Sequence, residues 1–221
     1  MGRRVVELTA EEVDLLPERC QHCLFWELGT ARPIERLGSV HGHDDELAAD
    51  PLTQKCAWWR AVELEWGSPG RFVRVDGEPV GWCLFADPGA FASRRRPVPP
   101  PSSDALFLAT IWVEPPFRGA GLGRLLLHTA VKEAIRRERR GIEAYGDRKH
   151  RDAACVAPCT WLLHEGFAVQ REHPRYPLLR LDVRSVARWT ETFEHAVEQA
   201  RSRLARRELA PAPHRPAVGR G

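Results

Sequence analysis

The sequence lacks the features that would place it in a membrane or outside the cell. None of its apolar runs approaches the roughly 20 residues that a transmembrane helix requires. The N-terminal residues 1–7 are charged and lack the apolar core of a signal peptide. We therefore expect a cytoplasmic protein with no membrane partner, in which the six cysteines are reduced thiols rather than a disulfide framework.

Most of the chain also has no net charge. The net charge is +3, and the seven arginines and four glutamates found from Ser185 onward account for all of it. The preceding residues are neutral overall, which argues against a broad surface for nucleic acid. We therefore expect no nucleic-acid partner.

A length of 221 residues suits one α/β domain with a sizeable core. Thr9 and Glu12 have the spacing of a helix capping box, and Asp76-Gly77 between alternating apolar residues predicts a hairpin turn. The unbroken apolar run 105–113 is typical of a central strand buried on both faces. We expect strands at 4–8, 71–75, 79–85, 105–113, 142–146, 167–171 and 177–183. We expect one helix that begins at Thr9 and three others at 51–66, 121–139 and 155–164.

The pattern changes near the C-terminal end. Apolar side chains from Val186 to Leu204 recur at helical spacing, so we expect an amphipathic helix over 185–208. Residues 209–221 lack core-forming side chains and are expected to form a disordered basic tail. The helix could form a homodimer interface, bind another partner, or pack on its own domain at 1–184, and its periodicity does not choose between these.

The most informative segment runs from Ile111 to Arg124. An apolar strand leads into two prolines, and then an arginine and three alternating glycines precede a leucine-rich helix. Glycine lets the backbone approach a ligand closely, and a helix N-terminus offers N–H donors and a positive dipole to an anion. The segment is therefore predicted to hold a phosphate group.

The glycine spacing separates this loop from other phosphate-binding loops. A P-loop requires lysine and then serine or threonine after its last glycine, but Arg124 and Leu125 stand there. A dinucleotide-binding loop requires its third glycine at the position of Arg124. The pattern that fits is Arg-x-x-Gly-x-Gly, formed by Arg118, Gly121 and Gly123. With the preceding Val-x-Pro, it resembles the acetyl-CoA pyrophosphate loop of the GNAT superfamily of N-acetyltransferases.

The resemblance covers about Arg4 to Val183, and a second mark of it is the segment 161–167, which looks like the family's helix before a Gly-Phe strand start. It implies an α/β (α+β) GNAT fold: a mixed, mostly antiparallel sheet of about seven strands, splayed between the fourth and fifth and flanked by helices. It also implies acetyl-CoA as co-substrate, and no metal is expected. The implied CoA-binding residues are Ile111, Trp112 and Val113, through their backbone, and Arg118, Gly119, Ala120, Gly121, Leu122, Gly123 and Arg124 of the loop.

Family members transfer the acyl group by direct attack of an amine on the thioester. A backbone amide of Trp112 or Val113 would stabilise the oxyanion. Many members place a tyrosine, as general acid, where this chain has Leu162. Many also place a glutamate, as general base, near the position of Asp104 and Ala105. Both usual groups are absent here, so catalysis would need other side chains or water.

Three further residues are candidates for the chemistry. Glu143 and Tyr145 alternate along a predicted strand and therefore share a face. If that face points into the opening of the sheet, Glu143 could act as a base and Tyr145 as an acid. The alternative is a structural pair. Cys155 is a third candidate because it would lie near the thiol end of CoA.

The remaining cysteines raise a separate question. Cys20-x-x-Cys23 and Cys155-x-x-x-Cys159 could bind zinc through four thiolates if the two segments meet. Buried thiols are the alternative, because the spacing matches no zinc ribbon or finger. Arg175, in the loop 173–176, could contact an acidic acceptor, or the loop could be a plain hairpin turn.

The sequence thus predicts an N-acetyltransferase that moves an acetyl group from acetyl-CoA to a primary amine on a small molecule, a peptide N-terminus or a protein lysine. One alternative is an acyl-CoA-binding regulatory module without turnover. A weaker alternative is a zinc- or redox-sensing protein that uses Cys20, Cys23, Cys155 and Cys159.

Overall fold

The computed structural model describes residues 2–29, 50–92, 100–149 and 155–183. The chain divides into two compact units, Met1–Val183 and Arg184–Gly221. All described residues belong to the first unit. The described residues do not include the predicted helix over 185–208 or the predicted tail 209–221. The possible homodimer through that helix therefore stays a prediction.

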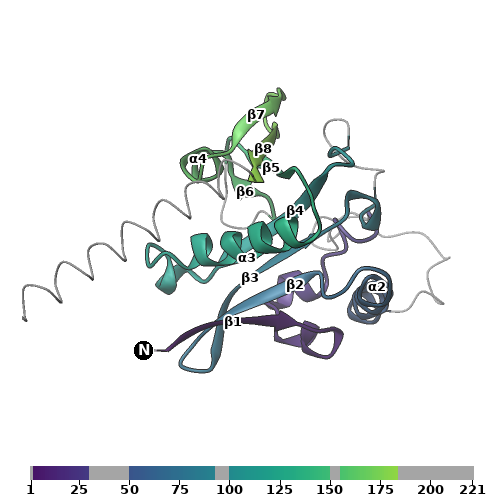
Figure 1. The fold of residues 1–221 in the computed structure, drawn as a ribbon. Coiled ribbons are helices and arrows are strands. Elements are labelled where there is room, and N and C mark those ends of the chain that lie inside the picture. The colour runs from purple at the N-terminus through teal and green to yellow at the C-terminus, as the bar shows by residue number, and fades with distance from the viewer. Residues whose placement is uncertain (1, 30–49, 93–99, 150–154, 184–221) are drawn as a thin grey trace, which may run out of the picture. The chain divides into compact units, whose positions relative to one another are not determined.

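One mixed sheet organises the first unit (Figure 1). Its strand order is β1-β2-β3-β4-β5-β8-β7, and β6 pairs with β5. The β4–β5 and β5–β6 pairs are parallel and the others are antiparallel, so the sheet is mixed and mostly antiparallel, as the family resemblance implied. The strands are β1 (Arg3–Leu8), β2 (Gly70–Val75), β3 (Glu78–Ala86), β4 (Ala105–Val113), β5 (Gly141–Asp147), β6 (Ala157–Pro158), β7 (Ala168–Arg171) and β8 (Leu178–Asp182).

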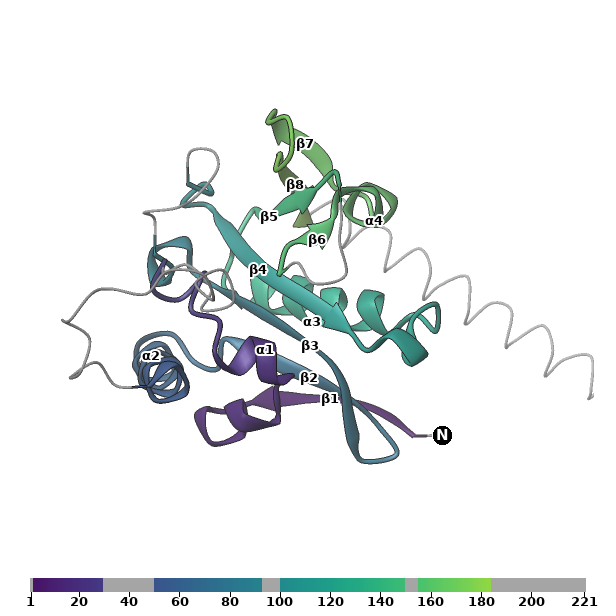
Figure 2. The same cartoon turned by 180° about the vertical axis from the view of Figure 1, so that it is seen from behind.

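Helices cover both faces of this sheet. α3 packs on β2, β3 and β4 from one side, and α1 and α2 lie on the other side (Figures 1 and 2). The helices are α1 (Glu18–Gln21), α2 (Pro51–Glu65), α3 (Leu122–Arg136) and α4 (Cys159–His164), with short 3-10 helices at Ala10–Leu15, Pro88–Ala90 and Pro115–Phe117.

The sheet opens between its two central strands. β4 and β5 pair along three positions, from Ala105–Gly141 to Phe107–Glu143. Beyond Phe107, β4 continues to Val113 with β3 on one edge, and no described strand pairs with its other edge. β5 pairs instead with β6, so the two central strands diverge. The predicted splay between the fourth and fifth strands is confirmed, and it leaves backbone groups of β4 available to a ligand.

Buried aromatic and charged contacts anchor the N-terminal segment to α2. The fully buried Trp59 donates its Nε1 hydrogen to the carbonyl of Leu8 at 3.1 Å, and its ring occupies the space where a Cβ on Gly70 would stand. Lys55 of α2 forms a buried ion pair with Glu27. These contacts hold the chain just after α1, where the ring of Trp26 packs against Phe107 of β4 and Tyr145 of β5.

Most predicted elements are present, with two corrections. The capping box of Thr9 and Glu12 forms, and Asp76 and Gly77 make the predicted hairpin turn. The helix expected from Cys155 instead begins at Cys159, because the two residues before it pair with β5 as β6. α3 ends at Arg136, three residues earlier than expected, and Glu138 takes a left-handed backbone conformation with φ of 55°.

A carboxylate near the end of α3 gives the fold a pH dependence. Burial alone would raise the pKa of Glu133, but hydrogen bonds from Arg136 and Arg137 outweigh it and hold that pKa at about 2. A depressed pKa means that this contribution to stability is present above the unfolded-state pKa of about 4.5 and is lost as the pH falls towards 2. Glu133→Gln should therefore lower the free energy of unfolding at pH 7 by on the order of 3 kcal/mol. Urea unfolding should show this gap shrinking below pH 4.5. A gap that is constant from pH 7 to pH 3 would contradict the prediction.

Candidate functional site

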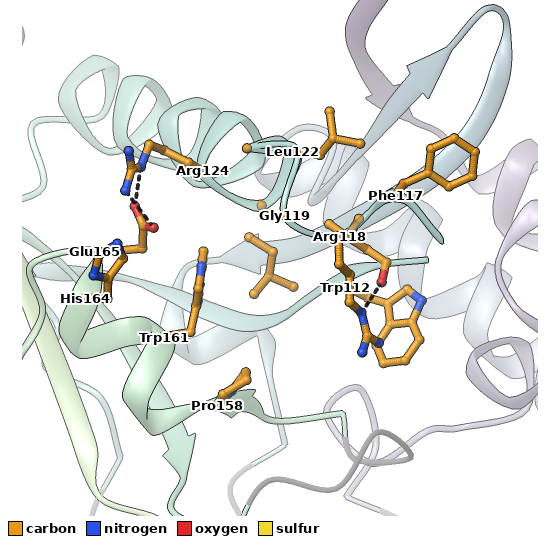
Figure 3. Close-up of a pocket in the computed structure, with 14 residues that line it drawn as sticks. Trp112, Phe117, Arg118, Gly119, Leu122, Arg124, Pro158, Trp161, His164 and Glu165 are labelled. Atoms are coloured by element: carbon orange, nitrogen blue, oxygen red, sulfur yellow. Dashed lines mark hydrogen bonds and ion pairs between the residues drawn. The ribbon is translucent and has the colours of Figure 1, made fainter. Parts of the chain in front are cut away.

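A cavity of about 540 Å³ lies between the unpaired edge of β4, the N-terminus of α3 and α4 (Figure 3). Nine of the ten residues predicted to bind CoA line it, and Ala120 does not. The carbonyl of Ala120 instead accepts a hydrogen bond from Arg3 at 2.9 Å. The predicted residues at the cavity are Ile111, Trp112, Val113, Arg118, Gly119, Gly121, Leu122, Gly123 and Arg124, and the sequence interpretation missed Phe117, Pro158, Trp161, His164 and Glu165.

The loop from Arg118 to Arg124, called the glycine loop below, is shaped for an anion. Gly119 and Gly121 have φ values of 77° and 79°, and a Cβ at either position would meet no atom within 4 Å. Gly121 is the N-cap of α3, and no side chain caps this helix. The first N–H groups of α3 therefore face the cavity with the positive end of the helix dipole, which favours a phosphate.

The direction of the β4 backbone changes one expectation. The amide of Glu114 donates to a carbonyl of β3 at 2.9 Å. Backbone groups alternate in direction along a strand, so those of Trp112 also point to β3, and those of Ile111 and Val113 point to the opening. The Val113 carbonyl accordingly accepts from Arg118 Nε at 2.9 Å. Trp112 therefore presents its side chain, not its amide, to the cavity.

Two arginines stack on Trp112, a residue that lines the cavity. The guanidinium of Arg118 lies 4.6 Å from the centre of the Trp112 ring, and that of Arg19 lies 4.0 Å from the same ring. Figure 3 shows Arg118 and Trp112 on one side of the cavity and Trp161 on the other. Stacking on an aromatic face orients each cation. This edge of the cavity therefore favours an anionic ligand.

α4 forms the opposite wall. Arg124 makes two hydrogen bonds to the carboxylate of Glu165, at 2.7 and 3.1 Å, and they raise the pKa of Arg124 (Figure 3). This pair ties the first turn of α3 to the end of α4. A Cβ built on Gly123 would lie only 3.3 Å from the ring of Trp161. Gly123 is therefore needed for the close approach of the two helices.

Glu143 does not reach the cavity. It is fully buried where β4 and β5 are still paired, and each carboxylate oxygen is engaged: one accepts from the amide of Ser102 at 2.7 Å and the other from Arg180 at 2.8 Å. Arg180 also makes two hydrogen bonds to Asp104, which lower the pKa of Asp104. This geometry corrects the expectation of a base at Glu143 and favours the structural alternative.

Tyr145 is likewise part of the core rather than a wall of the cavity. Its buried ring stacks on Trp26 with centroids 5.9 Å apart and lies edge-on to Phe107 at 5.7 Å. The expected role of Tyr145 as an acid in the opening is therefore not supported by its position. The Nε1 hydrogen of Trp26 has no hydrogen-bond partner among the described residues.

Asp147, the last residue of β5, is a functional candidate that the sequence interpretation missed. It is 1% exposed and lies beyond the point where β4 and β5 diverge, opposite Pro158, which lines the cavity. Its Oδ1 accepts from the amide of Lys149 at 2.9 Å and lies 3.5 Å from Nε of Arg175. Its Oδ2 has no hydrogen-bond partner within the part of the chain that the structure describes. A buried carboxylate oxygen without a partner is costly, and such groups gather at functional sites.

Two other expectations have clear outcomes. Leu162, which stands in place of the family's tyrosine, is fully buried. In the loop 173–176, Nδ1 of His173 accepts from the amides of Arg175 and Tyr176 at 3.2 and 2.8 Å, which makes a capped turn. Arg175 Nε lies 3.5 Å from Oδ1 of Asp147, and 42% of the Arg175 side chain is exposed.

The cysteines do not form the four-thiolate site. Cys23 and Cys155 lie with their Sγ atoms 3.5 Å apart. Among residues 2–29, 50–92, 100–149 and 155–183, no group of three or more metal-binding side chains is placed to hold an ion. Cys155 lies before β6, packs against the aromatic core and does not line the cavity. Its expected place at the thiol end of CoA is therefore not supported. In the same ranges, no helix is long and apolar enough to cross a membrane.

Comparison with known proteins agrees with this geometry. A family model described as "Acetyltransferase (GNAT) family" matches residues 36–155. A search of curated proteins gives no match. Solved structures share the fold at low identity. The PaiA N-acetyltransferase of Thermoplasma acidophilum, in complex with coenzyme A, is 12% identical with a TM-score of 0.53, covering 82% of this chain and 99% of that one.

Two further structures give the same result. YncA, a putative acetyltransferase from Salmonella typhimurium with its cofactor acetyl-CoA, is 16% identical, with a TM-score of 0.53 over 83% of this chain and 95% of that one. An N-acetyltransferase from Staphylococcus aureus Mu50 is 14% identical, with a TM-score of 0.51 over 83% of this chain and 99% of that one.

Proposed function

Because this chain belongs to the GNAT acetyltransferase family, we propose that it transfers an acetyl group from acetyl-CoA to a primary amine by direct attack of the amine on the thioester. The observation that carries the proposal is the uncapped N-terminus of α3, which opens with two left-handed glycines onto a cavity at the point where the central strands diverge. That combination suits a pyrophosphate followed by an extended chain.

The described residues fit such a ligand. The amides at the start of α3 and the glycine loop would hold the pyrophosphate, and the outward backbone groups of Ile111 and Val113 would bind the pantetheine arm. When bound, acetyl-CoA supplies the thioester that carries the acetyl group. When acetyl-CoA binds, the guanidinium of Arg118 would release the Val113 carbonyl and donate a hydrogen bond to a phosphate oxygen instead. An amide of Ile111 or Val113 would donate to the oxyanion as the amine attacks.

Asp147 would receive the amine at the edge of the cavity, because it does not line the cavity itself but pairs with Pro158, which does. Its unpartnered Oδ2 can accept a hydrogen from the amine and take the proton that the nitrogen loses as the new C–N bond forms. Oδ1 stays bound to Lys149 and faces Arg175, so the carboxylate keeps its orientation. The leaving thiolate would take its proton from solvent, because Leu162 stands where a tyrosine would supply it.

Two measurements test this function. Calorimetry with acetyl-CoA should show stoichiometric binding. A panel of amino acids, polyamines, aminoglycosides and peptides with free N-termini should release free CoA thiol with at least one member. Absence of binding by the folded protein would contradict the proposal. Binding without turnover across the panel would favour the regulatory module, an alternative that the replacement of the usual acid by Leu162 keeps open.

A further inference from the structure

Cys23 and Cys155 bring two thiol groups together from distant parts of the chain. Their Sγ atoms lie 3.5 Å apart, although 132 positions separate the two residues. A disulfide has an S–S distance of about 2.0 Å, so a displacement of about 1.5 Å would join them. Cys23 and Cys155 both lie in irregular segments, outside any helix or strand. Small backbone shifts and rotation of the side chains can supply that displacement.

Burial makes the other four cysteines weak nucleophiles. Burial raises the pKa of the Cys83 thiol to about 12. Burial also raises the pKa of the thiols of Cys20, Cys56 and Cys159. Because the thiolate is the reactive form of cysteine, these groups react slowly with oxidants. The short distance between the sulfurs therefore selects Cys23 and Cys155 as the pair that can form a disulfide. Burial of the other four thiols limits their oxidation.

Both segments of this pair border the opening of the sheet. Cys23 precedes Trp26, whose ring stacks on Tyr145 of β5. Cys155 packs against the same aromatic cluster and leads into β6, whose Pro158 lines the cavity. β6 lies across β4 from β3, at the start of α4 (Figure 2). A bond between these sulfurs would fasten the segment after α1 to the segment that leads into α4.

We propose that Cys23 and Cys155 are a modification site: peroxide converts them into a reversible disulfide that joins the two segments beside the cavity. Cys155 is half-buried and Cys23 is buried, so Cys155 meets the oxidant first. Its thiolate attacks hydrogen peroxide, the O–O bond breaks and hydroxide leaves, which gives a sulfenic acid. The Cys23 sulfur then attacks the Cys155 sulfur, the S–O bond breaks, and water leaves with the thiol proton.

The balance is two thiols and one peroxide to one disulfide and two waters. A small thiol such as dithiothreitol reverses the bond by exchange. The bond constrains a long loop of the unfolded chain, so the oxidised protein should also unfold at a higher temperature. One consequence rests on the proposed function, in which Asp147 receives the amine: Asp147 pairs with Pro158 of β6, and the disulfide would restrain β6, so oxidation should slow acetyl transfer while acetyl-CoA still binds.

Peptide mapping after treatment with one equivalent of hydrogen peroxide tests the site directly. Trypsin places Cys20 and Cys23 together in residues 20–36, and Cys155 and Cys159 together in residues 152–171. The expected product is a crosslink between these two peptides, with the free thiol count falling from six to four. Dithiothreitol should restore all six.

Single variants assign the crosslink within the two peptides. Cys20→Ser and Cys159→Ser should keep it, and Cys23→Ser and Cys155→Ser should each abolish it. Crosslinking that survives Cys23→Ser, or oxidation of the wild type to sulfinic acid with no crosslink, overturns the proposal. The wild-type map decides the matter even if a variant fails to fold.

The functional consequence has its own readout. Calorimetry should give an acetyl-CoA dissociation constant within twofold for the reduced and oxidised proteins. The transfer rate to the best amine of the panel should fall at least fivefold on oxidation and recover with dithiothreitol. If the fully crosslinked protein transfers acetyl groups at an unchanged rate, the claim that the disulfide slows acetyl transfer is wrong. A protein inactive in both states contradicts the proposed function, and the crosslink map still decides the disulfide.

Discussion

Gly121→Asp is expected to weaken acetyl-CoA binding about a hundredfold, which corresponds to about 2.7 kcal/mol. The N-cap of α3 faces the cavity, and no atom lies within 4 Å of a Cβ built there, so the side chain has room, although the φ of 79° strains any residue other than glycine. Aspartate tolerates the left-handed conformation better than most residues. Its charge is favourable at a helix N-terminus, so the folded protein should keep its stability. The same charge stands where the pyrophosphate would bind and repels it.

Gly121→Asn is the matched control for this variant. It has nearly the same shape and the same tolerance of a positive φ, but it carries no charge. Calorimetry should show a loss of affinity well below that of the aspartate variant, and thermal unfolding of both should stay within a few degrees of the wild type. Equal losses in the two variants would mean that backbone strain, not charge, controls the site. Undiminished binding by the aspartate variant would place the pyrophosphate elsewhere.

Asp147→Asn should lower kcat/KM for the amine by about a hundredfold or more, the range of a general base. The asparagine keeps an oxygen for the amide of Lys149 but cannot take a proton from the amine. Acetyl-CoA affinity should stay unchanged, because Asp147 does not line the cavity. Initial rates of CoA release with the best amine, beside calorimetry with acetyl-CoA, separate the two effects.

Glu172→Gln is the control for a loss of charge in the same region. Glu172 is exposed and pairs with Arg148, which directly follows Asp147, and we assign it no role in the chemistry. This variant should keep kcat/KM within about twofold. If Asp147→Asn loses acetyl-CoA binding together with turnover, Asp147 supports the fold of the opening rather than the amine. If it keeps full activity, another group or water accepts the proton.

The glycine loop could be predicted from the sequence because its signal is local. Two left-handed glycines and an uncapped helix start are properties of consecutive residues, so spacing alone indicated an anion site there. The strand order followed from the same kind of signal, since alternation, turn residues and helix stops act over a few positions. These features also separated the loop from a P-loop and a dinucleotide-binding loop.

The catalytic candidates depended on contacts between distant residues. Glu143 and Asp147 lie on the same strand four residues apart, and the sequence interpretation considered only Glu143. Arg180 of β8 and the amide of Ser102 occupy the carboxylate of Glu143, and no local pattern announces either partner. Asp147 lies beyond the last paired residue of β4, a position that the sheet register sets.

The sequence by itself therefore determined where an anion-binding loop forms, because such a loop is built from the geometry and backbone dipoles of adjacent residues. Only the tertiary structure decided which carboxylate keeps an oxygen without a partner among the described residues, which backbone groups of β4 face the opening, and which two cysteines meet. Each of these depends on where separate strands end and diverge. Burial and pairing at those ends come from residues as far apart as Cys23 and Cys155.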